Sequence, residues 1–330
     1  MVKRRDLVGL MGGVMAAAAL PLPRASAAEQ RKVVFFLKNV SNPFYKAVHD
    51  GAEQSAKDGN IAISFAAPTK PDNIEEQIRL VEDWVTRKPD GMVFVPVDYK
   101  AMGPSAMKIK EAKIPLIIYN NKMTSIADTP FIGLDDEKIG YEASKHLFQA
   151  LGGNGSVIHI DGVPGSITAQ DRKRGFDRAM KEFPGIKLLA SQPGNYLRLA
   201  AMQVFENLMQ RFPKIDGVMA ANDDMAVGIV ESSRSAGRDT IKVVGVDCIA
   251  DAAKAIKDGR MLGSIDTMPF SQGYLALRMM IELLNGTKLP PTIMLPVNFV
   301  DRSGIDPYLL PMNQHPIPDW NTVLKSQGTT

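Results

Sequence analysis

The chain runs from Val33-Val34-Phe35-Phe36-Leu37-Lys38 directly into Asn39-Val40-Ser41-Asn42-Pro43-Phe44-Tyr45. A short apolar run of this kind is typical of a buried parallel strand. Asn42 and Pro43 then end the strand and begin a helix, because proline is favoured in a first helical turn. The segment therefore predicts an amide and two aromatic rings at the carboxyl end of a strand, which is where open α/β sheets bind ligands.

Phe44 and Tyr45 suit a sugar ring, which is apolar on its C–H faces and hydroxylated at its rim. Alternatively, the two rings pack the first helix against the sheet. That is common for one ring and less expected for two rings that point in different directions.

Short apolar strands alternate with helical patterns along most of the chain. The strands are expected near 33–38, 61–66, 92–95, 116–119, 157–160, 187–190, 218–220, 243–246 and 263–266. The helices are expected near 43–58, 72–87, 100–113, 137–151, 169–183, 197–212, 224–236, 249–258 and 271–285. This alternation predicts parallel sheets covered by helices on both faces. A chain of this length favours two domains.

Residues 1–28 are predicted to be a signal peptide, with a basic start (Lys3, Arg4, Arg5), an apolar stretch and a small-residue cleavage site at 25–27. The pair Arg4-Arg5 favours twin-arginine export, while Asp6-Leu7 keeps the Sec route open. Either route predicts a periplasmic protein. The leader carries a net charge of +3, equal to that of the whole chain. The mature chain is therefore near neutral, and we expect no nucleic-acid partner.

Several motifs together resemble the ribose-type (type I) periplasmic sugar-binding proteins of ABC importers. That family carries Asn-Pro-Phe and a second aromatic at positions matching 42–45. Further matches follow in order at Asp90-Gly91-Met92-Val93, Ile114-Pro115-Leu116-Ile117-Ile118-Tyr119, Arg174-Gly175-Phe176, 221–228 and 243–247. The resemblance covers nearly the whole mature chain. It implies two doubly wound parallel-sheet lobes joined by a three-strand hinge, with crossings near 133–136, 265–268 and about 297–301.

On this resemblance, each lobe is discontinuous in sequence. The N-terminal lobe comprises 29–133 and about 268–297, and the C-terminal lobe comprises 134–267 and about 298–330. The tail after Gly286 is rich in proline, which favours an extended segment across the lobes over another helix.

The sequence does not contain the motifs of common enzyme classes. The first strand is not followed by the glycine-rich turn of dinucleotide-binding folds. The four histidines lack metal-ligand spacing, and no nucleophile elbow is present. We therefore expect no catalytic residue, no cofactor and no metal, and a binding protein instead of an enzyme.

Candidate ligand-binding residues follow from the strand ends and from the resemblance. Asn120, Asn121, Asn222 and Asp247 follow strands and offer hydrogen-bonding partners for vicinal hydroxyls. The family pattern places Asn42, Phe44, Tyr45, Tyr196, Asn222 and Asp247 along a cleft. At further positions of the pattern this chain differs from its relatives. Asn120-Asn121 replaces an Asp-Arg pair, and Gln170 replaces an arginine. Thr267 replaces a glutamine at the hinge, and Lys38 replaces a small polar residue. The complete set is Lys38, Asn42, Phe44, Tyr45, Asn120, Asn121, Gln170, Tyr196, Asn222, Asp247 and Thr267.

Structural alternatives exist for several of these residues. Asn222 or Asp223 caps the next helix, a role we assign to Asp223, and Asp247 caps the helix near Ile249. Tyr196 packs in a first helical turn. Lys38 extends from the strand end into solvent.

The matched set is neutral overall, which favours a neutral sugar, deoxysugar or polyol over a sugar acid. An inward-facing Arg172 would favour a sugar-acid receptor. Lys38 and Gln170 resemble the rhamnose- and autoinducer-2-binding branch. We expect a monomeric receptor that delivers its ligand to the membrane permease of an ABC importer. The alternative is a periplasmic sugar sensor for a chemoreceptor or kinase. A regulator of the lactose-repressor type would need an N-terminal DNA-binding module, where the signal peptide lies.

Overall fold

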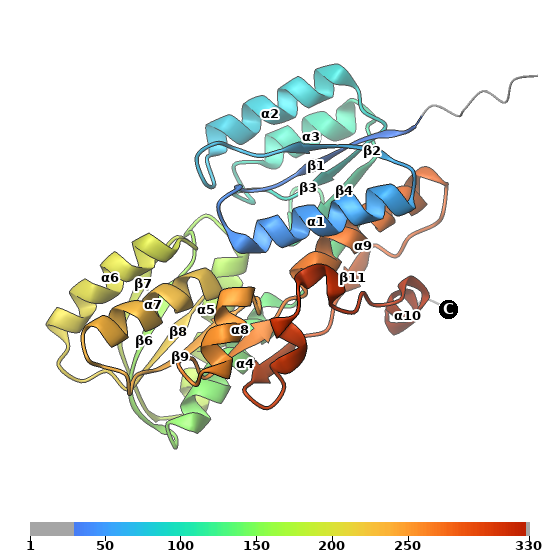
Figure 1. Cartoon of the computed structure of the whole chain (residues 1–330). Helices are drawn as coiled ribbons and strands as arrows, with labels where there is room; N and C mark the ends of the chain where they lie inside the picture. The colour runs from blue at the N-terminus through green and yellow to red at the C-terminus, as the bar shows by residue number, and fades with distance from the viewer. Residues whose placement is uncertain (1–29, 328–330) are drawn as a thin grey trace, which may run out of the picture.

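Two six-stranded sheets, each flanked by helices, form two lobes in the computed structural model (Figure 1), which describes residues 30–327. The predicted signal peptide at 1–28 and the last three residues of the predicted C-terminal lobe lie outside the described residues. Within residues 30–327, no helix has the length and apolar character needed to cross a membrane.

The first lobe contains a parallel sheet in the order β11-β5-β4-β3-β1-β2. Its strands are β1 (Lys32–Phe36), β2 (Ala62–Ala66), β3 (Gly91–Phe94), β4 (Leu116–Tyr119), β5 (Phe131–Gly133) and β11 (Thr292–Met294). Its helices are α1 (Pro43–Asp58), α2 (Ile74–Arg87), α3 (Gly103–Glu111) and α9 (Pro269–Leu284). Phe35 packs in one apolar cluster with α1 and α9, while Phe36 packs in another with α2 and α3. Burial on both faces explains the continuous apolar run of β1.

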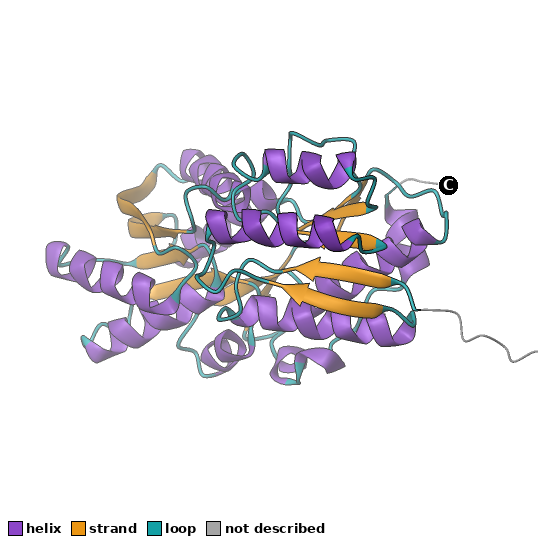
Figure 2. Ribbon diagram, turned by 90° about the horizontal axis from the view of Figure 1, so that it is seen from above, coloured by secondary structure: helices purple, strands orange, loops and turns teal. Residues whose placement is uncertain are grey.

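The second lobe contains a sheet in the order β12-β10-β9-β8-β6-β7. Its strands are β6 (Asn154–Asp161), β7 (Gly185–Pro193), β8 (Gly217–Ala220), β9 (Lys242–Val246), β10 (Gly263–Asp266) and β12 (Asn298–Asp301). Its helices are α4 (Asp136–Ala150), α5 (Ile167–Glu182), α6 (Arg198–Arg211), α7 (Asp223–Ser235) and α8 (Ala250–Lys257). Helices cover both faces of the sheets (Figure 2). The predicted fold class is confirmed.

Strand β12 is the exception to the predicted parallel order, because it pairs antiparallel with β10. Asn298, the first residue of β12, pairs with Asp266, the last residue of β10. The chain reaches β12 directly from β11 in the other lobe. A strand that arrives at the carboxyl end of β10 must run back along it, so its direction follows from the crossing.

The chain passes between the sheets at three places: between β5 and α4, between β10 and α9, and between β11 and β12. The tail then forms two short 3₁₀ helices, η1 (Asp306–Leu309) and η2 (Met312–Gln314), and the helix α10 (Trp320–Ser326). The prediction that the tail contains no further helix is wrong. Asp319 caps α10 by accepting from the Thr322 amide at 2.9 Å, and Gln327 accepts from the β11 amide of Met294 at 2.9 Å. The end of the tail therefore packs on the first lobe.

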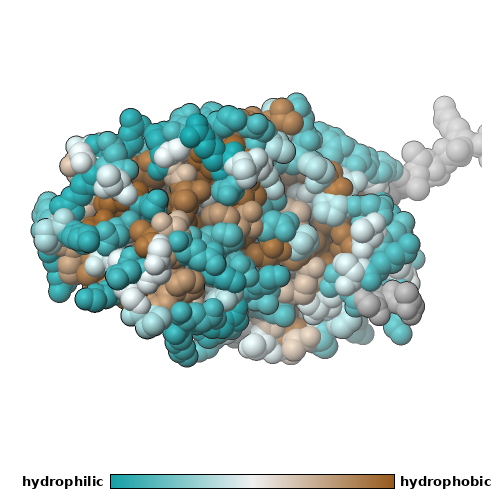
Figure 3. Space-filling view, turned by 90° about the horizontal axis from the view of Figure 1, so that it is seen from below, coloured by the Kyte–Doolittle hydropathy of each residue, from teal (hydrophilic) through white to brown (hydrophobic). Residues whose placement is uncertain are grey.

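Helices α4 and α5 approach each other so closely that glycine is required at their contact. A Cβ atom on Gly140 would lie 2.0 Å from the Arg172 carbonyl oxygen, and one on Gly175 would lie 2.0 Å from the Glu137 carbonyl oxygen. This contact fixes the position of Arg172 on α5. The face of the molecule drawn in Figure 3 is largely hydrophilic, with apolar residues interspersed.

Candidate ligand-binding site

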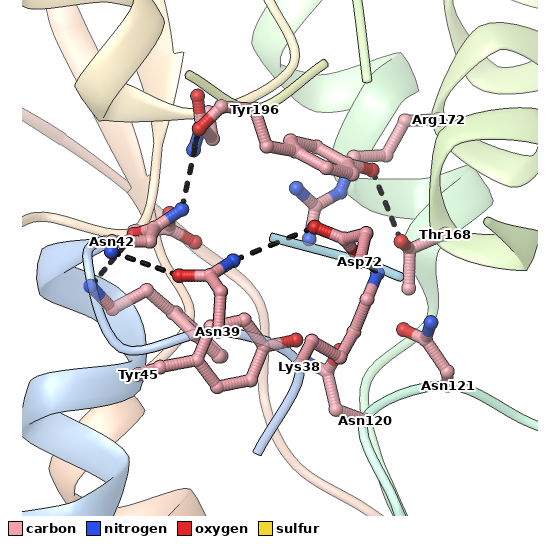
Figure 4. A pocket seen from close by; sticks show the side chains of 13 residues that line it. Lys38, Asn39, Asn42, Tyr45, Asp72, Asn120, Asn121, Thr168, Arg172 and Tyr196 are labelled. Atoms are coloured by element: carbon pink, nitrogen blue, oxygen red, sulfur yellow. Dashed lines mark hydrogen bonds and ion pairs between the residues drawn. The ribbon is translucent and has the colours of Figure 1, made fainter. Parts of the chain in front are cut away.

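A cavity lies between the lobes, at the carboxyl ends of both sheets, and encloses about 380 Å³ of space not filled by protein atoms, its mouth included. Side chains from both lobes point into it (Figure 4). It is lined by Lys38, Asn39, Asn42, Phe44, Tyr45, Asp72, Asn120, Asn121, Thr168, Arg172, Tyr196, Asn222 and Asp247. All predicted site residues are in this set except Gln170 and Thr267. Sequence reasoning missed Asn39, Asp72 and Thr168 and left Arg172 as an alternative.

The segment between β1 and α1 is held by its own asparagines. Asn39 Oδ1 accepts from the Asn42 amide at 2.9 Å. Asn42 caps α1, because its Oδ1 accepts from the Phe44 amide at 2.9 Å. With that oxygen occupied, the Asn42 Nδ2 faces the other lobe and donates to the Tyr196 carbonyl at 3.4 Å.

Phe44 and Tyr45 are both buried and both line the cavity. Their ring centroids lie 5.0 Å apart in an edge-to-face arrangement. Both also belong to the apolar cluster that joins α1 to the sheet, so packing and cavity lining coexist. Burial raises the pKa of the Tyr45 hydroxyl, which keeps it protonated as a hydrogen-bond donor.

Lys38 is buried and forms an ion pair with Asp72, with Nζ 2.7 Å from Oδ1. Only 3% and 7% of the two side chains are exposed. The alternative that Lys38 extends into solvent is therefore wrong. Asp72 also accepts from Asn39 Nδ2 at 3.4 Å. The sequence could have indicated Asp72 through its position in the loop after β2. Because β2 is the neighbour of β1, this loop lies at the same edge of the sheet as Lys38.

Tyr196 lies in the loop before α6, so the alternative of first-turn packing is wrong. Its backbone is left-handed, with φ of 59°, and its carbonyl accepts from Asn42 at 3.4 Å and from Asn222 at 3.3 Å. Its hydroxyl lies 3.0 Å from Thr168 Oγ1. Only glycine fits beneath the ring, since a Cβ on Gly162 would lie 2.1 Å from Cζ. The Tyr196 backbone thus links the two lobes.

Asn222, and not Asp223, caps α7, because its Oδ1 accepts from the Met225 amide at 3.1 Å. The prediction for Asp223 is wrong. Asp223 instead accepts from the Ile249 amide at 3.1 Å and from the Ser264 hydroxyl at 2.7 Å. Asp223 therefore accepts from the backbone at the start of α8. The alternative that Asp247 caps this helix is also wrong.

Asp247 lines the cavity and accepts from the Thr267 hydroxyl at 3.0 Å. Burial raises the pKa of its carboxyl, and the nearby Arg172 guanidinium opposes that shift. Thr267 is buried but does not line the cavity. It contacts the site through Asp247.

Arg172 is buried and lines the cavity, whereas Gln170 does not. Residues two apart on a helix lie on nearly opposite faces, so only one of the two can face the cleft. Gln170 donates to the Pro164 carbonyl at 2.9 Å. Arg172 forms an ion pair with Asp136 at 2.9 Å and donates to the Ala221 carbonyl at 2.6 Å. Burial raises the pKa of Asp136 to about 6, against the opposing effect of Arg172.

Asn121 has an oxygen without a protein partner. The residue is fully buried, and its Nδ2 donates to the Pro96 carbonyl at 3.0 Å and lies 3.5 Å from Ser166 Oγ. Its Oδ1 accepts no hydrogen bond from the described residues. Buried polar atoms are nearly always paired, so this oxygen marks a place where a ligand would donate. Within residues 30–327, no cluster of three acidic, histidine or cysteine side chains is arranged to hold a metal.

Comparison with known proteins agrees with this architecture. A family model described as a periplasmic binding protein domain matches residues 33–288. The D-allose-binding periplasmic protein of Escherichia coli is 30% identical over 81% of this chain and 88% of that protein. The ribose import binding protein of Salmonella typhimurium is 27% identical over 80% and 88%, respectively. A periplasmic solute binding protein of an ABC transporter from Actinobacillus succinogenes, solved with bound D-allose, is 30% identical, with a TM-score of 0.80 over 84% of this chain and 99% of that chain.

Proteins of this family are solute receptors and not enzymes, in agreement with the sequence-based expectation. The finer resemblance to the rhamnose- and autoinducer-2-binding branch stays a prediction. The extent of the match and the shared two-lobed architecture show that the chain belongs to the periplasmic binding protein family of type I, alongside ribose- and allose-binding relatives.

Proposed function

We propose that this protein is a periplasmic receptor that captures one neutral monosaccharide, deoxysugar or polyol between its lobes and delivers it to the permease of an ABC importer. The ribose- and allose-binding relatives support a sugar ligand and an import role. Its acting as a monomer stays a prediction, as does the route of its export.

The charges of the cavity favour a neutral ligand. Its two cationic side chains, Lys38 and Arg172, are matched in number by two carboxylates, Asp72 and Asp247. Lys38 is paired with Asp72, and Arg172 is paired with Asp136 just outside the lining. No lining cation is left to neutralise an anionic ligand, although Arg172 faces inward. A sugar acid would therefore enter a site whose positive charge is already compensated.

The observation that supports this proposal most directly is the unpaired Asn121 oxygen, in a cavity that is also lined by the aromatic rings of Phe44, Tyr45 and Tyr196. A ligand hydroxyl group can donate to that oxygen, and Lys38, Tyr45 and Arg172, which line the same cavity, carry hydrogen-bond donors for ligand oxygens. Phe44 and Tyr45 offer apolar contact to the C–H groups of a small ring or chain. The D-allose bound to the relative from Actinobacillus succinogenes supports a single monosaccharide-sized molecule.

Isothermal titration calorimetry against a panel of neutral sugars, deoxysugars, polyols and sugar acids tests this proposal. We expect binding of a neutral member, with affinity that changes little with ionic strength. Tight and selective binding of an aldonate or uronate, with all neutral compounds inert, would show that the ligand class is wrong.

Two variants separate binding from folding. Asp247→Ala should weaken binding of the panel ligand by about 2–4 kcal/mol, because it removes a buried carboxyl group that bonds to the ligand in a dry cavity. Asp224→Ala, in the first turn of α7 and paired with Arg198 outside the cavity, should leave the affinity unchanged. Equal affinities for the two variants would contradict the proposed role of Asp247.

A further inference from the structure

We propose that Gln272 and Thr267 are positioning residues, forming a hydrogen-bond relay through the hinge that orients Asn120 and Asp247 so that both present acceptor oxygens to the ligand. The inference rests on the proposed function, since it concerns the same cavity. Neither Gln272 nor Thr267 lines the cavity. Both are almost completely buried, with 1% of each exposed.

The relay joins cavity residues of opposite lobes through the crossing between β10 and α9. Asn120 Nδ2 donates to Gln272 Oε1 at 3.2 Å, and Gln272 Nε2 donates to the Thr267 carbonyl at 2.7 Å. The Thr267 hydroxyl then donates to Asp247 Oδ1 at 3.0 Å. Asn120 follows β4 in the first lobe, and Asp247 follows β9 in the second. The four residues thus form a continuous hydrogen-bonded connection between the lobes.

The direction of each bond is fixed by the chemistry of the groups. A backbone carbonyl only accepts, so the Gln272 amide must turn its nitrogen to Thr267 and its oxygen to Asn120. That oxygen can only accept, so Asn120 must turn its nitrogen to Gln272. Its Oδ1 is left without a partner among the described residues. At the other end, Thr267 occupies Asp247 Oδ1, and Oδ2 has no partner in the same part of the chain.

The relay therefore offers an acceptor from each lobe. Together with the unpaired Asn121 oxygen, this region favours ligand hydroxyl groups that donate, and disfavours ether or carbonyl oxygens there. Met268, which directly follows Thr267 at this crossing, has a left-handed backbone with φ of 50°. Because Gln272 holds the Thr267 carbonyl across that residue, it restrains rotation of the hinge as well as the orientation of the two ligand contacts.

Calorimetry with a ligand found by the panel, together with small-angle scattering of the ligand-free protein, tests the relay. Gln272→Met keeps the volume and removes both side-chain hydrogen bonds, and Thr267→Val keeps the shape and removes the hydroxyl. Each should lower the affinity about 10- to 100-fold. Their combined effect should be smaller than the product of the two, because they interrupt one connection. Thr267→Ser retains the hydroxyl and should restore most of the affinity.

Wild-type affinity in both Gln272→Met and Thr267→Val would overturn the relay, as would equal losses in Thr267→Ser and Thr267→Val. If Gln272→Met does not fold, the ligand affinities of Thr267→Val and Thr267→Ser test the relay by themselves. If no compound of the panel binds the wild type, the proposed ligand class fails, and the relay is judged by scattering alone. In that case a larger radius of gyration for ligand-free Gln272→Met than for wild type supports it, and an unchanged radius overturns it.

Discussion

Lys38 illustrates how a single residue combines folding and binding. Its ammonium group is buried against Asp72 and lies 5.6 Å from the centre of the Tyr196 ring, which belongs to the other lobe. Breaking a buried ion pair from one side leaves an uncompensated charge, which is far more destabilising than replacing both partners. The role of this lysine must therefore be tested on the ion pair as a unit.

Lys38→Met should lower the free energy of unfolding of the ligand-free protein by about 3–5 kcal/mol, because it leaves the Asp72 carboxylate buried and unpaired. The double variant Lys38→Met with Asp72→Asn should recover most of this stability. Urea unfolding of the wild type, both single variants and the double variant measures the coupling. A stable Lys38→Met protein would contradict the buried pair. Ligand affinity should be lower in Lys38→Met and in the double variant, since both lack the ammonium group as a hydrogen-bond donor.

The second prediction at this scale concerns pH. Burial raises the pKa of Asp223 from its usual 3.8 to about 7. The folded protein thus holds a proton that the unfolded chain releases between these values. Stability from this group is present at low pH and is lost as the pH rises from about 4 to about 7, with a slope of at most about 1.4 kcal/mol per pH unit. Asp223→Asn should flatten the measured stability–pH curve across this range. An equally steep curve in the variant would contradict the assignment.

At the scale of elements, pairs of helices determine where site residues lie. In the first lobe, a Cβ on Gly273 of α9 would lie 1.9 Å from the Val48 carbonyl oxygen of α1. The contact of α4 with α5 repeats this arrangement in the second lobe through Gly140 and Gly175. Helix pairs with close backbone contact thus occur in both lobes and include α1 and α5, which carry cavity residues.

Gly140→Ala should force α4 and α5 apart, because its Cβ would meet the Arg172 backbone at 2.0 Å. We expect a loss of about 1–3 kcal/mol in stability and a loss of ligand affinity, since Arg172 is displaced. Gly217→Ala is the matched control in the same lobe. Its Cβ would meet only leucine side chains at 2.9–3.4 Å, which can move, and it lies at the start of β8, away from the cavity. Calorimetry should find normal affinity in the control, and reduced affinity there would contradict this explanation.

At the scale of the whole molecule, few hydrogen bonds among residues 30–327 connect the two lobes across the cleft, and they are long. Asn42 reaches the Tyr196 carbonyl at 3.4 Å, and Asn121 and Tyr99 reach Ser166 and Gln170 at 3.5 Å each. Long contacts of this kind are weak. A ligand that bonds to both lobes would therefore add most of the attraction that keeps the cleft closed.

We predict that the ligand shifts the population towards a closed form by rotation at the three crossings. Small-angle scattering should show a smaller radius of gyration with saturating ligand than without it. A compound of the panel that does not bind serves as the control. An unchanged radius with tightly bound ligand would contradict closure.

Much of the fold was predictable because its determinants are local. The apolar run before Asn42 and the proline at 43 defined β1 and the start of α1 within a few residues. The strands β5, β11 and β12 were not predicted as strands, because β5 and β11 have only three residues each and β12 is a short strand at the edge of its sheet. Such segments become strands only when a neighbouring strand is there to pair with them. The helix α10 likewise depends on packing against the first lobe.

The sequence by itself determined the order of strands and helices, the two-lobed class and most of the residues at the strand ends that line the cavity. These features depend on periodicity, on caps and on the rule that parallel strands present their carboxyl ends at one edge. Only the tertiary structure decided that Arg172 and not Gln170 faces the cleft, that Lys38 pairs with Asp72, and that Thr267 bonds to Asp247 without lining the cavity. The physical reason is that each of these depends on which segments, distant in sequence, are brought within hydrogen-bonding distance by the packing of the two sheets.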